Sequence, residues 1–194
     1  MIKFLVCCTV LAAVVIVVKG MGDNMIGPGR WYVLSIAQCD NNDQYEQQYF
    51  IQRKKLTRDQ DCYNANISLK NPLDETYAIR IDLTKCVDGG CKPYQVLSDE
   101  SFIHFCEKYA KENVEEALKM AGTDPPKFPL DAGTYSINEY KFNYCQLPTD
   151  GVYGKFGATA YLIKDQQEVG CVTFNVEFRE IDGACDGDDV DEED

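Results

Sequence analysis

The stretch Val172-Thr173-Phe174-Asn175-Val176-Glu177-Phe178-Arg179 alternates apolar and polar side chains without a break. Successive side chains of a β-strand point to opposite faces, so this pattern predicts a strand with one face buried and the other in water. The range 79–83, Ile-Arg-Ile-Asp-Leu, repeats the pattern. Shorter alternating segments, which predict further strands, lie at 32–36, 49–56, 67–69, 135–145 and 156–163.

Turn-forming residues separate these segments. They lie at Asn71-Pro72, Asp88-Gly89-Gly90, Asp131-Ala132-Gly133 and Thr149-Asp150-Gly151. Proline fixes its own backbone angle, and glycine tolerates the left-handed angles that tight turns need. About seven strands with one apolar face each predict an antiparallel β-sandwich or an open β-cup.

One segment departs from the period of two. From Phe102 to Met120 the apolar residues recur at helical spacing, which predicts one helix between the strands. Asp99 is the expected cap at its start, Gly122 its expected end, and Pro125-Pro126 forbids continuation. The predicted fold class is therefore mainly β: a single antiparallel cup or sandwich with one helix, held together by disulfides.

The first twenty residues predict export. Lys3 precedes a run of apolar residues from 4 to 18. Val18 and Gly20 place small residues at the two positions that signal peptidase reads, which favours cleavage after Gly20. The alternative is an uncleaved anchor, although the run is short for a membrane span and no second one follows. We therefore expect a secreted protein without stable membrane insertion.

The mature chain keeps eight cysteines, and an even number in an exported chain is typical of a disulfide framework. They are Cys39, Cys62, Cys86, Cys91, Cys106, Cys145, Cys171 and Cys185.

Charge divides the mature chain into two parts. After removal of 1–20 it holds 17 basic and 32 acidic residues, and eight of the acids lie in 182–194. Such a run of like charge cannot bury apolar area, so we expect 182–194 to be a disordered, solubilising tail and 21–181 to be the folded domain. Weak calcium binding is the alternative role for the tail. The negative charge argues against binding to nucleic acid. The sequon at Asn66 predicts an N-linked glycan.

The sequence contains no recognisable catalytic constellation. His104 is the only histidine, and it is expected on the exposed face of the helix. Neither a nucleophile elbow nor a metal-binding spacing of cysteine and histidine is present, so we expect no enzyme, no cofactor and no metal. Aromatic residues gather in the second half of the chain. They suit a filled core or a cavity, and composition alone favours the filled core.

Three stretches resemble the lysosomal ganglioside activator family of lipid-binding proteins. Ser101-Phe102-Ile103-His104-Phe105-Cys106 is similar to its motif of an aromatic followed by His-Phe-Cys. The range 127–136, Lys-Phe-Pro-Leu-Asp-Ala-Gly-Thr-Tyr-Ser, resembles its Gly-Thr-Tyr-Ser segment. A turn and strand at 151–156 and a Gly-Cys strand at 168–174 resemble its closing strands. The resemblance covers about 86–181, and an arthropod branch of secreted, chemosensory-type proteins is similar in size and signal peptide.

The resemblance implies a β-cup around an apolar cavity, and hence a secreted carrier or presenter of a lipid or other apolar small ligand. The alternatives are an extracellular structural or receptor-binding module with a filled core, and a lipid-presenting cofactor of a hydrolase. Burial of each methylene contributes about 0.8 kcal/mol, so an acyl chain needs few polar contacts. The residues expected from alternation to line the cavity are Ile79, Ile81, Leu83, Phe142, Phe156, Val172, Phe174, Val176 and Phe178.

The family pattern also suggests disulfide pairings. It implies a bridge from Cys39 to Cys171, which joins the first and last strands. The family pairs its helix cysteine with one just before the Gly-Thr-Tyr-Ser segment; this chain has none there, so Cys145 is the expected substitute partner of Cys106. The two cysteines that flank the Asp-Gly-Gly turn, Cys86 and Cys91, are expected to close a small loop. Cys62 and Cys185 are then left to each other.

Overall fold

The computed structural model describes residues 26–56 and 61–180 and is mainly β, as the sequence predicts. The predicted signal peptide, the acidic tail and Cys185 lie outside these residues. The described elements are β1 (Ile26–Gln38), η1 (Asn42–Gln44), β2 (Gln47–Lys55), β3 (Asp61–Leu69), β4 (Ala78–Val87), β5 (Gly90–Asp99), α2 (Phe102–Met120), β6 (Gly133–Tyr140), η2 (Tyr144–Gln146), β7 (Asp150–Val152), β8 (Gly154–Lys164) and β9 (Gln167–Glu180).

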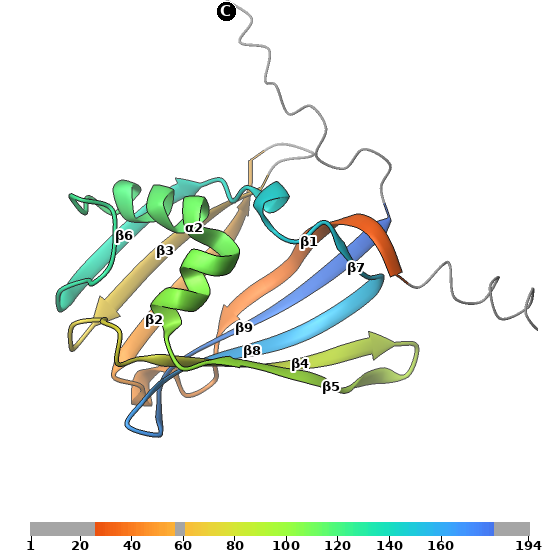
Figure 1. The fold of residues 1–194 in the computed structure, drawn as a ribbon, viewed down its shortest axis with the longest axis horizontal. Helices are drawn as coiled ribbons and strands as arrows, with labels where there is room; N and C mark the ends of the chain where they lie inside the picture. The colour runs from red at the N-terminus through yellow and green to blue at the C-terminus, as the bar shows by residue number, and fades with distance from the viewer. Residues whose placement is uncertain (1–25, 57–60, 181–194) are drawn as a thin grey trace, which may run out of the picture.

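Two antiparallel sheets form the walls of a cup (Figure 1). The larger sheet has the order β5-β4-β8-β9-β1-β7, and the smaller has the order β2-β3-β6. They meet where β2 contacts β1 and β9, and α2 crosses the open side to contact β6 of one sheet and β4 and β5 of the other. A sheet with one apolar face must bury that face, and here the two sheets and the helix enclose it together.

A disulfide between Cys39 and Cys171 joins the end of β1 to β9, with Cα atoms 5.7 Å apart. It lies close to the edge at which the two sheets meet, since β1 and β9 both contact β2. A second disulfide joins Cys86 to Cys91 across the turn of the β4–β5 hairpin. Both bridges agree with the sequence-based prediction.

A β-bulge at Leu34 changes the alternation in β1. Val33 pairs with Val176 and Ser35 with Asn175, so Leu34 is an extra residue without a partner on β9. A bulge lets residues on either side of it face the same way. As a result Val33 and Ile36 both face the interior, while Leu34 is exposed. Strict alternation over 32–36 would have placed Leu34 inside.

Helix α2 has the predicted bounds but a different N-cap. The Ser101 hydroxyl accepts the hydrogen bond from the His104 backbone N–H at 3.1 Å, whereas Asp99 accepts from the Ser101 N–H at 2.9 Å. The expectation that Asp99 caps the helix is therefore wrong. At the other end Gly122 has a φ of +83°, and its N–H bonds to the Lys119 carbonyl. With the Thr123 N–H bonded to the Leu118 carbonyl, this is a Schellman termination.

The backbone of α2 is kinked at Ala110, where φ is −151° and ψ is 30°. The helix therefore has two segments, one on each side of this residue. The sequence also predicted one strand over 135–145, but β6 ends at Tyr140, and the chain continues through η2. No helix among the described residues combines the length and the apolar character needed to cross a membrane.

The packed core lies at one side of the cup interior. Its main cluster joins the small sheet, the 70–77 segment, α2 and the β8–β9 hairpin, and consists of Leu69, Leu73, Tyr77, Leu118, Leu130, Leu162 and Val169. Gln47 is fully buried beside it, and its amide nitrogen donates to the Tyr77 hydroxyl at 3.1 Å. This core holds the two sheets together, and a second, smaller cluster on the large sheet consists of Ile79, Ile81 and Ala158.

Candidate functional site: an apolar cavity

A cavity of about 740 Å³ lies between the two sheets and α2. This volume is within the range of pockets that hold small organic ligands. No residue on its wall is acidic, basic or histidine. The wall consists of Trp31, Val33, Ile36, Ile51, Tyr63, Ala65, Ile67, Ile81, Leu83, Tyr94, Gln95, Leu97, Phe105, Tyr109, Ile137, Tyr140, Phe142, Tyr144, Leu147, Pro148, Val152, Phe156, Phe174 and Val176.

Six of the nine residues predicted from alternation lie on this wall: Ile81, Leu83, Phe142, Phe156, Phe174 and Val176. Ile79, Val172 and Phe178 lie outside it. Ile79 packs in a core cluster with Ile81 and Ala158, and Phe178 is 1% exposed beneath the Trp31 ring. Val172 lies beyond Phe174, toward the start of β9. Alternation identifies the inward face of a strand, but not how far along the strand the cavity extends.

Sequence reasoning missed most of the opposite wall. The small sheet contributes Ile51, Tyr63, Ala65, Ile67, Ile137 and Tyr140. The apolar face of α2 contributes Phe105 and Tyr109. The sequence carries a signal for several of these residues, since 49–56, 67–69 and the helical stripe of 102–120 have apolar faces. Sequence periodicity does not show that these faces lie opposite each other across a cavity.

Aromatic rings form a continuous row at one end of the cavity. The Phe156 ring lies 5.6 Å from Tyr94 and 6.2 Å from Trp31, centroid to centroid. Phe178 continues the row, 4.8 Å from Trp31 and stacked on Tyr153 at 5.6 Å. Aromatic pairs at such distances stabilise each other beyond the area they bury. This end of the cavity is thus lined by aromatic rings in mutual contact.

Several polar atoms on the wall are already hydrogen-bonded within the protein. The Tyr63 and Tyr144 hydroxyls bond to each other. The Trp31 indole N–H donates to the Pro148 carbonyl at 3.0 Å. Burial and this mutual hydrogen bond raise the pKa of Tyr63, and burial raises that of Tyr140, so both phenols stay neutral at physiological pH. The wall therefore presents an uncharged surface to a ligand.

The buried amide of Asn113 in α2 holds the 141–149 segment, which carries four wall residues. This side chain is 2% exposed. Its Oδ1 accepts from the Tyr140 hydroxyl and from the Asn143 N–H, both at 2.8 Å, and its Nδ2 donates to the Asn143 carbonyl at 2.9 Å. Because a buried amide needs all its partners, the arrangement fixes the segment against the helix.

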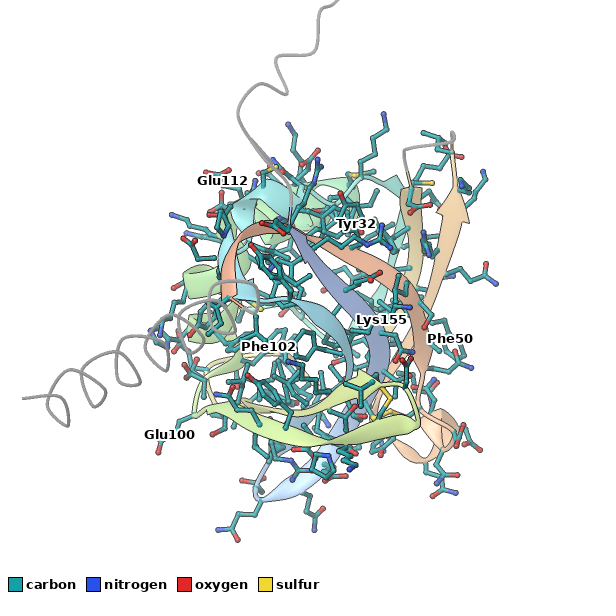
Figure 2. All side chains as sticks on the ribbon, turned by 90° about the vertical axis from the view of Figure 1, so that its right-hand side faces the viewer. Tyr32, Phe50, Glu100, Phe102, Glu112 and Lys155 are labelled. Carbon is teal, nitrogen blue, oxygen red and sulfur yellow. A yellow bond between two sulfur atoms is a disulfide. The ribbon has the colours of Figure 1, made fainter. Side chains whose placement is uncertain are left out.

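The mouth of the cavity is marked by the wall residues that remain exposed. Tyr94 is 47% and Tyr109 37% exposed, and Gln95 and Pro148 are also exposed. They lie on β5, on α2 and in the 141–149 segment. Figure 2 views the molecule from the end of the β4–β5 hairpin and shows side chains gathered between this hairpin and β1. A ligand thus has an approach between the hairpin and the helix.

Two of the predicted disulfides are not formed. Cys106 and Cys62 are free thiols, so the pairings of Cys106 with Cys145 and of Cys62 with Cys185 are wrong. Cys145 is disulfide-bonded, but not to either of these two. Cys62 is buried on β3 and Cys106 lies partly buried on α2. Pairing by family pattern failed here because a partner was inferred from strand order rather than from spatial proximity.

The remaining predicted residues occupy surface positions. Asn66 is exposed on β3, on the face opposite Ala65 and Ile67, where Ser136 donates to its Oδ1 at 2.8 Å. His104 is exposed, and its Nδ1 lies 2.8 Å from Asp99 Oδ2. Within the described ranges no three His, Cys, Asp or Glu side chains gather as a metal site would require.

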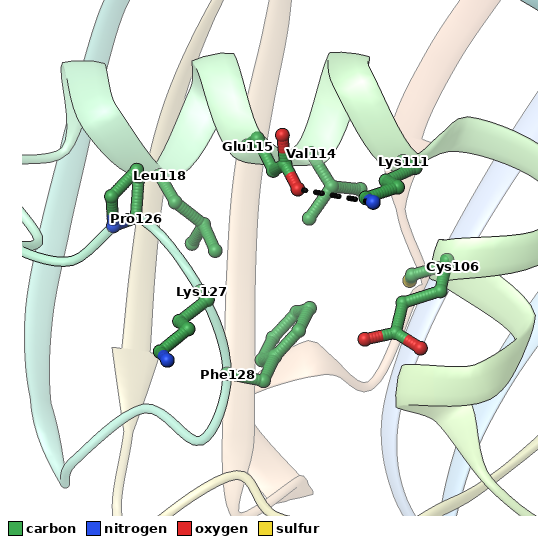
Figure 3. A pocket seen from close by; sticks show the side chains of 9 residues that line it. Cys106, Lys111, Val114, Glu115, Leu118, Pro126, Lys127 and Phe128 are labelled. Atoms are coloured by element: carbon green, nitrogen blue, oxygen red, sulfur yellow. Dashed lines mark ion pairs between the residues drawn. The ribbon is translucent and has the colours of Figure 1, made fainter.

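A second, much smaller hollow lies between α2 and the 126–128 segment (Figure 3). Its volume is about 30 Å³, enough for only a water molecule or two. Cys106 borders it, as do Phe128 and the Lys111–Glu115 pair, whose charged atoms are 4.0 Å apart. Burial, followed by the nearby Glu107, raises the pKa of the Cys106 thiol to about 12, which argues against a reactive thiolate. This hollow is not a ligand site.

Comparison with known proteins identifies no family. No protein-family model matches the chain, and a search of curated proteins returned no significant match. The cavity is therefore the feature on which a functional assignment rests.

Proposed function

We propose that the protein is a secreted carrier or presenter of a lipid or another apolar small molecule, held in the cavity between the two sheets and α2. The observation that carries the proposal is a cavity of about 740 Å³ without a charged residue on its wall. Water gains few hydrogen bonds in such a space, and each methylene that displaces it contributes about 0.8 kcal/mol. The exposed residues at the mouth allow the polar end of a ligand to remain in water.

Further features support this proposal. The Cys39–Cys171 and Cys86–Cys91 disulfides suit an oxidising compartment, and an exposed Asn66 suits an N-linked glycan. The β-cup and the three motifs between 101 and 174 suit membership of the ganglioside-activator-like lipid-binding family. The neutral wall and the absence of a catalytic constellation from the sequence favour binding over catalysis.

The alternative of an extracellular module with a filled core predicts an interior without a cavity of this size, so the cavity disfavours it. A lipid-presenting cofactor of a hydrolase requires the same cavity and, in addition, a partner enzyme. Binding to such an enzyme under acidic conditions would favour that role over simple transport. We place the carrier first because it requires no partner.

The proposal is tested by native mass spectrometry and by organic extraction of the protein purified from a secreting host. We expect a co-purified apolar molecule and saturable uptake of a fluorescent fatty acid. Ala65 lies on the cavity wall between Tyr63 and Ile67, so Ala65→Trp fills the cavity and is expected to abolish uptake. Gln52→Trp places the same side chain on the exposed face of β2 and is the matched control. A wild-type protein without ligand or uptake would refute the proposal.

A further inference from the structure

Lys85 continues the inward-facing row of β4 after Ile81 and Leu83, toward the cavity mouth. In the antiparallel ladder it lies directly opposite Phe156, a wall residue on β8. Side chains of opposed residues share one face of a sheet, so the lysine points to the same side as the Phe156 ring. Lys85 is half-buried, whereas most of the other described lysines are exposed.

The Lys85 ammonium lies over two rings of the cavity. Its nitrogen is 5.8 Å from the centroid of Phe156 and 5.9 Å from that of Tyr94. Both distances are near the limit of a cation–π contact, so neither ring replaces a hydrogen-bond acceptor. The stem of the side chain runs past Gly154 on β8, where an added Cβ would lie 3.6 Å from Lys85 Cε. The ammonium is thus held at the edge of an apolar space.

Lys85 has no carboxylate partner in the described part of the chain, where its interactions are those with the two rings. By contrast, Lys54, Arg80 and Arg179 each form a close ion pair with an acidic side chain. A half-buried ammonium loses part of its hydration, and an anion at the mouth would restore its hydrogen bonds.

We propose that Lys85 binds the anionic head of the ligand and that the ligand class is a long-chain carboxylate of the fatty-acid type. This inference rests on the proposed lipid-carrier function. The chain enters the uncharged cavity while the carboxylate stays at the mouth beside the ammonium. The net charge of the whole chain, −13, opposes an anion, but charges beyond about 10 Å are largely screened at 0.1 M salt. Direct contact with Lys85 therefore decides the preference.

The test compares oleate with oleyl alcohol, which has the same chain and an uncharged head. Each displaces a neutral fluorescent probe, N-phenyl-1-naphthylamine, from the full-length protein at neutral pH. We expect wild type to bind oleate about fivefold more tightly than the alcohol. This ratio lies between the affinity gains that exposed and buried ion pairs typically give. Lys85→Met keeps the stem and is expected to lose this preference while its affinity for the alcohol stays within about twofold.

Two further variants make the result specific. Lys85→Arg keeps the positive charge and should retain the preference for oleate. Lys155→Met removes a charge from the exposed face of β8, directly beside Cys86, and should leave the preference unchanged. Equal oleate-to-alcohol ratios in wild type and Lys85→Met would overturn the role of Lys85 and leave the cavity proposal intact. Failure of the probe and both lipids to bind wild type would overturn both proposals.

Discussion

Replacement of Asn113 by alanine tests whether one buried amide holds the wall of the cavity. The substitution removes three hydrogen bonds: those from the Tyr140 hydroxyl and the Asn143 N–H to Oδ1, and that from Nδ2 to the Asn143 carbonyl. Tyr140 keeps a second acceptor, because its hydroxyl also lies 2.8 Å from the Asn113 carbonyl. At about 1 kcal/mol for each bond, the free energy of unfolding should fall by about 3 kcal/mol.

A loss of about 3 kcal/mol is a large share of the stability of a typical domain, and it is measurable by urea denaturation. Asn138→Ala on the exposed side of β6 is the control and should change the free energy of unfolding by less than about 0.5 kcal/mol. Because the 141–149 segment forms part of the mouth, a bound fluorescent lipid should also dissociate faster from Asn113→Ala. A loss below about 1 kcal/mol, with an unchanged dissociation rate, would refute the role assigned to this amide.

Three further predictions concern the cysteines and Asn66. Replacing both Cys39 and Cys171 by alanine should lower the free energy of unfolding by about 5 kcal/mol, and replacing both Cys86 and Cys91 should lower it by only about 2 kcal/mol. The first disulfide closes a loop with a sequence separation of 132 and the second one of 5, and a longer loop loses more entropy when it is closed in the unfolded chain. Equal losses in denaturant titrations would contradict this order. Because burial raises the pKa of the Cys106 thiol to about 12, roughly one part in ten thousand is thiolate at pH 8. Iodoacetamide should therefore label Cys106 quickly only after unfolding. Rapid labelling of the native protein would contradict its burial. Peptide-N-glycosidase should shift the mass of protein secreted by eukaryotic cells, and Asn66→Gln, which keeps a polar side chain on the exposed face of β3, should abolish the shift; a mass unaffected by the enzyme would exclude the glycan.

The strand and helix pattern was predictable where local periodicity is strong. Helix α2 begins and ends where the apolar spacing and Gly122 indicate, and β9 follows the alternation of 172–179. The prediction failed at Leu34, because a bulge moves one residue out of register for reasons that depend on the neighbouring strand. It failed again after Tyr140, where the hydrogen bonds of a distant amide, Asn113, replace a strand by a loop.

The cavity wall was predictable only in part, for the same reason. Alternation placed Phe174 and Val176 inside, and both lie on the wall. It also placed Phe178 inside, correctly, but Trp31 covers that ring and separates it from the open space. The free thiols of Cys62 and Cys106 follow from where β3 and α2 lie in space, which spacing along the chain does not encode.

The sequence by itself determined the mainly β class, the single helix and which face of each long strand is apolar, because these depend on neighbours two to four residues apart. The hollow interior was decided by the tertiary structure alone. The sequence pattern of an apolar face is the same whether another face packs directly against it or lies across a cavity from it. Here the curvature of the two sheets and the position of α2 hold the apolar faces apart. The same geometry places Lys85 at the mouth and leaves Cys62 and Cys106 as free thiols.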